Sequence, residues 1–151
     1  MTGQERHVLI VANRTAATET LLEAVRERAQ AGPAAFHLLV PATPRGLHRL
    51  VDPEVAGREE ARAQLEIALE LLREATGTDV TGHVGDSDPV SAISDTIHEH
   101  DVDEIIISTL PRRLSRWMRI DLPSKVRGWG KPVTHVEGER APAEVVGGRA
   151  V

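Results

Sequence analysis

The run Ile105-Ile106-Ile107 restricts the possible folds of this chain more than any other stretch of its sequence. Three β-branched residues in succession favour an extended strand, and a strand that is apolar at every position needs cover on both faces. Such strands are typical of parallel sheets with helices on both sides. Pro111 has no N–H group and cannot continue a central strand, so we expect the strand to end just before it.

Short apolar runs alternate with helical patterns along the rest of the chain. Four further strands are expected, over residues 7–12, 36–40, 79–84 and 133–136. Because strands that alternate with helices are joined by right-handed crossovers, we predict an α/β fold with a five-stranded parallel sheet. The first strand and the isoleucine strand are the most continuously apolar, so we predict that they are neighbours at the centre of the sheet.

The composition excludes several classes of protein. The chain has 151 residues, a net charge of −5, no cysteine and only three aromatic residues, so it lacks the basic surface and stacking rings of nucleic-acid binders. No apolar run approaches the roughly 20 residues of a membrane span. We therefore expect a cytoplasmic protein that binds neither nucleic acid nor membrane. The expected organisation is one domain over 7–136, with an N-terminal tail at 1–6 and a flexible C-terminal tail at 137–151.

The isoleucine strand leads into a loop that carries hydroxyl groups and four arginines. Ser108 and Thr109 are followed by Arg112, Arg113, Arg116 and Arg119. Asp121 is the expected N-cap of the next helix, with Pro123 in its first turn. In open α/β sheets ligands bind outside the carboxyl ends of the strands, and arginine is a strong partner of phosphate. This loop is therefore the first candidate for a functional site.

Two other interpretations of the loop stay open. The two hydroxyl groups could satisfy backbone groups at the end of the strand instead of binding a ligand. The arginines could lie on a solvated loop, or on a short amphipathic segment whose apolar side, including Trp117, packs on the sheet.

Several features taken together resemble the universal stress protein family over residues 7–136. They are Gly85-Asp86-x-x-Pro89, the acidic start of the isoleucine strand at Asp103-Glu104, Pro123-Ser124-Lys125-Val126, and Lys131-Pro132-Val133. The resemblance implies a three-layer Rossmann-like fold of the adenine nucleotide alpha hydrolase type, with strand order 3-2-1-4-5. It also implies a homodimer formed through the last strand, Val133–Val136, and ATP binding in some members.

The chain departs from the ATP-binding loop of this family, which is similar to G-x-x-G followed about nine residues later by G-S or G-T. Ser108 and Pro111 stand at the first two glycine positions, and Asp121 falls near the last. Pro111 removes an amide donor and Asp121 adds a negative charge, so the phosphate-binding backbone is altered. Asn13 stands where nucleotide-binding members carry an aspartate.

The functional prediction is a non-catalytic protein that binds a nucleotide such as ATP, or another phosphorylated small molecule, at the carboxyl ends of strands 1 and 4. The alternative is a ligand-independent dimeric regulatory protein of the stress response. A weak ATPase would need a catalytic base, and the sequence contains no phosphate-binding loop motif or nucleophile elbow. The candidate ligand contacts are Asn13, Thr15, Val40, Ser108, Thr109, Arg112, Arg113 and Ser124.

No metal site is predicted from the histidines. His98 and His100 are two residues apart, so they do not face each other on a helix. The other five histidines are far apart in the sequence, and no H-E-x-x-H motif is present.

Overall fold

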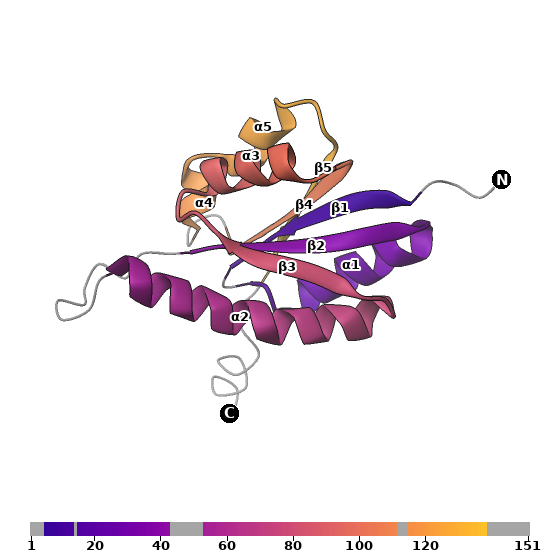
Figure 1. Ribbon diagram of the computed structural model, residues 1–151. Helices are drawn as coiled ribbons and strands as arrows, with labels where there is room; N and C mark the ends of the chain where they lie inside the picture. The colour runs from indigo at the N-terminus through magenta and orange to yellow at the C-terminus, as the bar shows by residue number, and fades with distance from the viewer. Residues whose placement is uncertain (1–4, 14, 43–52, 112–114, 139–151) are drawn as a thin grey trace.

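The computed structural model describes residues 5–13, 15–42, 53–111 and 115–138 (Figure 1). Its sheet has five parallel strands in the order β3-β2-β1-β4-β5, which confirms the predicted topology and the central pair β1 and β4. The strands are β1 (Arg6–Val11), β2 (Ala34–Pro41), β3 (Val80–Gly85), β4 (Glu104–Thr109) and β5 (Val133–Glu137). The helices are α1 (Glu19–Ala31), α2 (Pro53–Thr76), α3 (Pro89–Glu99), α4 (Arg116–Arg119) and α5 (Leu122–Arg127).

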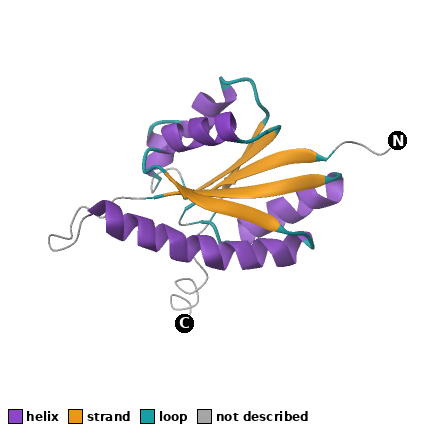
Figure 2. Cartoon of the chain, in the orientation of Figure 1, coloured by secondary structure: helices purple, strands orange, loops and turns teal. Residues whose placement is uncertain are grey.

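The helices form two layers that enclose the sheet (Figure 2). α1 and α2 lie on one face, and α3, α4 and α5 lie on the other (Figure 1). Each face has its own apolar core, and alternate residues of the central strands serve the two cores because side chains alternate across a strand. In β1, for example, Val8 and Ile10 pack toward α1 and α2, whereas Leu9 and Val11 pack toward α3 and α5.

The strand boundaries differ from the predicted ones by one or two residues. β1 begins at Arg6, inside the segment predicted as an N-terminal tail, and β5 includes Glu137, the first residue of the predicted C-terminal tail. Residues 1–4 and 139–151 of these tails lie outside the described residues. Among the helices that are described, none is both long enough and apolar enough to cross a membrane.

The side chain of the N-cap residue accepts a hydrogen bond from the first turn in α1 and α3, but not in α5. The Thr18 hydroxyl accepts a hydrogen bond from the Leu21 amide at the start of α1, and the Asp88 carboxylate accepts one from the Val90 amide at the start of α3. Asp121 occupies the N-cap position of α5, as predicted, but it lacks the side-chain cap that this residue type favours. Its backbone is left-handed, with φ of 54°, and its side chain makes no cap hydrogen bond.

An ion pair ties α1 to the start of β4. The Glu104 carboxylate accepts hydrogen bonds from the Arg28 guanidinium through Nε (2.8 Å) and a terminal nitrogen (3.1 Å), and from Arg6 Nε (2.8 Å). The Arg28 hydrogen bonds are the largest cause that lowers the pKa of Glu104, and the same bonds raise the pKa of Arg28. The acidic start of the isoleucine strand therefore holds a helix in place.

Candidate functional site

The carboxyl ends of β1 and β4 lie side by side because the two strands are neighbours in the sheet. Thr15, in the turn after β1, meets Ser108, near the end of β4, with 2.6 Å between their hydroxyl oxygens. Both side chains are buried. A hydrogen bond between hydroxyl groups therefore joins two segments that are far apart in the sequence, at the edge where a ligand was predicted.

The same turn is fastened to the first residues of α1. The Thr18 hydroxyl donates to the Thr15 carbonyl oxygen at 2.9 Å and accepts from the Leu21 amide at 3.4 Å. The Ala16 amide donates to the Asn13 carbonyl oxygen. The path of the chain from β1 into α1 is thus set by short-range hydrogen bonds, and the half-buried Asn13 side chain lies at its beginning.

The end of β4 is also bound to the end of β5. The Thr109 hydroxyl donates to the Leu110 carbonyl oxygen at 2.9 Å and lies 2.8 Å from His135 Nε2, which therefore acts as the donor. Burial, more than any other cause, lowers the pKa of His135. The Gly138 amide donates to the Thr109 carbonyl oxygen at 2.7 Å.

Gly138 packs closely against the turn that follows β1. A Cβ atom on this glycine would lie 3.0 Å from the Thr18 hydroxyl and 3.2 Å from Thr15 Cβ. The chain that leaves β5 therefore passes against the β1 turn, and the ends of three strands form one hydrogen-bonded unit.

The predicted contact residues fall into three groups by accessibility. Thr15, Ser108 and Thr109 are buried and already have hydrogen-bond partners, and the Val40 side chain is buried as well. Their hydroxyls would reach a ligand only if the internal hydrogen bonds opened. Asn13 is half-buried, and Ser124 is exposed on α5. The remaining two, Arg112 and Arg113, lie outside the described residues.

The segment after the arginine pair forms the short helix α4, in agreement with the amphipathic alternative for this loop. Ser115 caps it by accepting a hydrogen bond from the Met118 amide. Trp117 is buried in the core beneath α3 and α5, while Arg116 and Arg119 are exposed. Positive charge therefore stands at the surface close in sequence to the end of β4.

Three of the histidines that are far apart in the sequence are neighbours in the fold. His37 lies on β2, His83 on β3 and His100 just beyond α3, and one ring nitrogen of each lies within 4.8 Å of the others. Burial first, and then the nearby His83 and His100, lower the pKa of His37 to about 4; burial also lowers the pKa of His83. The sequence places His37 and His83 on two expected strands, but it does not show that the two residues are in contact, because that depends on the register of the strands.

Comparisons with solved structures find the same fold. A universal stress protein from Archaeoglobus fulgidus superposes with a TM-score of 0.61 at 18% identity, over 87% of this chain and 93% of that one. A universal stress protein in complex with cAMP superposes with a TM-score of 0.60 at 18% identity, over 90% of this chain and 99% of that one. A universal stress protein from Archaeoglobus fulgidus in complex with dAMP superposes with a TM-score of 0.58 at 19% identity, over 89% of this chain and 98% of that one.

Sequence comparison supports the same relationship. No curated protein sequence matches the chain significantly. The profile described as the universal stress protein family, however, matches residues 5–126. Because this match covers most of the chain, the protein belongs to the universal stress protein family.

Proposed function

We propose that this protein is a non-catalytic universal stress protein that binds an adenine nucleotide at the carboxyl ends of β1 and β4. The observation that carries the proposal is the strand order. From β1 the chain proceeds outward through β2 and β3 on one side, and β4 and β5 lie on the other. The strand order reverses between β1 and β4, and open α/β sheets bind ligands at the carboxyl ends of the strands on either side of such a reversal.

Two of the similar structures supply the ligand class. One is a universal stress protein in complex with cAMP and the other is in complex with dAMP. Each of these ligands carries one phosphate group, whereas the triphosphate of ATP needs a longer row of backbone donors. In this chain Pro111 offers no amide, so we expect AMP-like ligands to bind more tightly than ATP.

The proposed contacts are the half-buried Asn13 and the exposed Ser124, Arg116 and Arg119, together with Arg112 and Arg113, which lie outside the described residues. Asn13 would face the nucleoside, while Ser124 and the arginines at 112, 113, 116 and 119 would approach the phosphate. Guanidinium groups bind phosphate through charge-assisted and often bidentate hydrogen bonds, which can take the place of missing backbone donors. The buried Thr15–Ser108 pair would support the site by fixing the β1 turn.

The test is thermal unfolding of the full chain with AMP, cAMP and ATP, with affinities measured by calorimetry. At a hundred times the dissociation constant a ligand stabilises the fold by about 2.7 kcal/mol. For a chain of this size that raises the melting temperature by roughly 5–10 °C. The double variant R112A/R113A should lose this shift. The matched control R26A/R62A removes the same charge from α1 and α2, on the face of the sheet opposite to α4 and α5 (Figure 1), and should keep the shift.

The outcome that defeats the proposal is equally definite. If no nucleotide in the panel shifts the melting temperature or gives heat of binding, the ligand-independent regulatory function becomes the leading hypothesis. A shift that the control variant loses to the same extent would indicate nonspecific attraction of anions.

We further propose that the protein forms a homodimer through β5. This strand is an edge of the sheet, and Thr134 on it is exposed. Trp129, in the turn before it, is 41% exposed. An unpaired edge with exposed apolar neighbours favours association. Sedimentation at tens of micromolar should give a dimer, and T134K should give a monomer; a monomeric wild-type protein would refute the proposal.

A further inference from the structure

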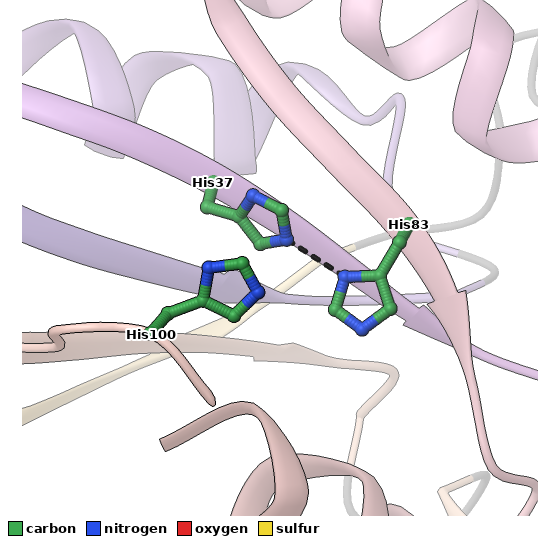
Figure 3. A group of neighbouring side chains, drawn as sticks. All are labelled: His37, His83 and His100. Atoms are coloured by element: carbon green, nitrogen blue, oxygen red, sulfur yellow. Dashed lines mark hydrogen bonds between the residues drawn. The ribbon is translucent and has the colours of Figure 1, made fainter. Parts of the chain in front are cut away.

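A cluster of three histidines lies on the face of the sheet that α3 covers (Figure 3). The imidazoles of His37, His83 and His100 point toward one another from β2, β3 and the end of α3 (Figure 3). The ring centroid of His37 lies 4.9 Å from that of His83 and 4.8 Å from that of His100. His83 and His100 are 6.0 Å apart, so no ring stands outside the group.

The backbone determines this convergence. His37 pairs in register with Thr81, and His83 is the next residue of β3 on the same face, because side chains alternate across a strand. Leu39, which follows His37 on that face, packs in the core with α3. The amide of His100 donates to the Thr96 carbonyl oxygen and closes the end of α3 over the two strands.

From this geometry we infer that His37, His83 and His100 bind a divalent transition metal ion of the Zn²⁺ type. Tetrahedral zinc holds imidazole nitrogens at about 2.0–2.1 Å, which places the nitrogens about 3.3 Å from one another. His37 Nε2 and His83 Nδ1 are 2.7 Å apart, and all three ligand atoms lie within 4.8 Å. Side-chain movements of about 1 Å would therefore bring the three nitrogens to the distances that zinc requires.

Thr81 fixes the orientation of the most buried ligand. Its hydroxyl oxygen lies 2.7 Å from His37 Nδ1. When His37 Nδ1–H donates to this oxygen, Nε2 presents its lone pair to the centre of the cluster. A hydrogen bond to the second ring nitrogen is the usual device that orients a metal-binding histidine. The metal would replace the His37–His83 hydrogen bond, and the His83 proton would then reside on Nε2.

Charge and space around the cluster also suit a cation. The carboxyl end of α3 carries the negative end of the helix dipole, beside His100. Glu99 acts on His83 as a nearby negative charge, and Asp101 lines the adjoining cavity. That cavity measures about 180 Å³ and is lined by His37, His100, Thr81, Asp101 and His7 among others. It has room for water as a fourth ligand, as in zinc sites with three protein ligands.

This site is separate from the proposed nucleotide site. Its cavity is bordered by the first residues of β1, β2 and β3, whereas the nucleotide is proposed to bind where β1 and β4 end. The inference therefore stands or falls independently of the proposed function.

The experiment uses the full chain without a histidine tag, freed of metal by a chelator. Calorimetry with ZnCl₂ should show one ion per chain, and Co²⁺ should give the visible absorption of a tetrahedral site. H100A and H83N each remove one ligand. T81V removes only the orienting hydrogen bond and should weaken binding by about 10–100-fold. Each ligand variant should weaken it by more than T81V does.

The matched control is H98A. His98 is exposed on α3 two residues from His100, and it lies outside the cluster. It should bind Zn²⁺ as the wild type does. Circular dichroism of each metal-free variant verifies the fold, and H100A alters only an exposed side chain. The inference is overturned if the wild type takes up no Zn²⁺, or if folded H100A and H83N bind it as tightly as the H98A control.

Discussion

Replacing Glu104 with glutamine should uncouple α1 from β4. The carboxylate accepts two hydrogen bonds from Arg28 and one from Arg6. The Glu104 and Arg28 side chains are only 21% and 17% exposed, whereas Arg6 is 49% exposed. Glutamine keeps the shape of the side chain but loses the charge and one acceptor oxygen. The substitution therefore removes the ion pair and part of its hydrogen bonding while it keeps the packing of the side chain.

The expected cost is about 2 kcal/mol. Hydrogen bonds to charged groups contribute about 1.5–3 kcal/mol, and we assign this contribution to the partly buried Arg28 pair. The Arg6 pair is largely solvated and adds less than about 1 kcal/mol. A loss of about 2 kcal/mol lowers the melting temperature of a chain this long by roughly 4–8 °C.

The contribution of Glu104 should also depend on pH. Its pKa is lowered in the folded protein, first by the Arg28 hydrogen bonds, so the folded state favours the ionised form. In the unfolded chain a glutamate carboxylate is protonated near pH 4.3. The stabilisation is therefore complete above that pH and is lost as the pH falls through the folded pKa. The difference between wild type and E104Q should be constant from pH 7 to about 5 and shrink below 4.

Urea unfolding at several pH values, followed by tryptophan fluorescence, measures this difference. E66Q serves as the control, because Glu66 is exposed on α2 and its loss should change stability by less than about 0.5 kcal/mol. Equal stabilities of E104Q and wild type at pH 7 would refute the assignment. So would a difference that persists unchanged to pH 3.

Three further sets of substitutions test the fold and the site. G82A should cost about 1–3 kcal/mol in urea unfolding, because its Cβ would lie 2.8 Å from the Leu38 carbonyl oxygen, whereas G32A, with nothing within 4 Å, should cost less than 0.5. S108A and T15V should each cost about 1–3 kcal/mol, and the double variant less than their sum, because each single change leaves one buried hydroxyl without its partner; additive effects would contradict the pair. D121G replaces a residue in the left-handed conformation with glycine and removes an exposed negative charge near the proposed phosphate position. Loss of the repulsion between this charge and the phosphate, up to about 1 kcal/mol, should raise the nucleotide affinity measured by calorimetry a few-fold. An unchanged affinity would place the phosphate elsewhere.

The sequence was sufficient for the fold because the relevant signals are local. An apolar run such as Ile105–Ile107 needs cover on both faces wherever it occurs, and caps such as Asp88 act within one turn. The resemblance to a known family added the strand order. These sources together predicted the architecture to within one or two residues at the strand ends.

The site was harder to predict because its contacts join distant segments. The Thr15–Ser108 pair depends on the register of β1 and β4, and the histidine cluster depends on that of β2 and β3. The Arg28–Glu104 pair depends on how α1 packs against the sheet. No local pattern encodes a register. Asp121 shows a different limit, because its residue type favours capping while the backbone at this position adopts the left-handed conformation instead.

The parallel sheet has a practical consequence for handling the protein. β1 begins at the edge near the histidine cavity, which His7 helps to line, whereas Gly138 leaves β5 against the turn at the opposite edge. A label attached at the exposed Glu5 would be tethered near the proposed metal site, and one attached at the exposed Glu137 would be tethered near the proposed nucleotide site. The position of such a label therefore decides which of the two proposed sites can be assayed without interference.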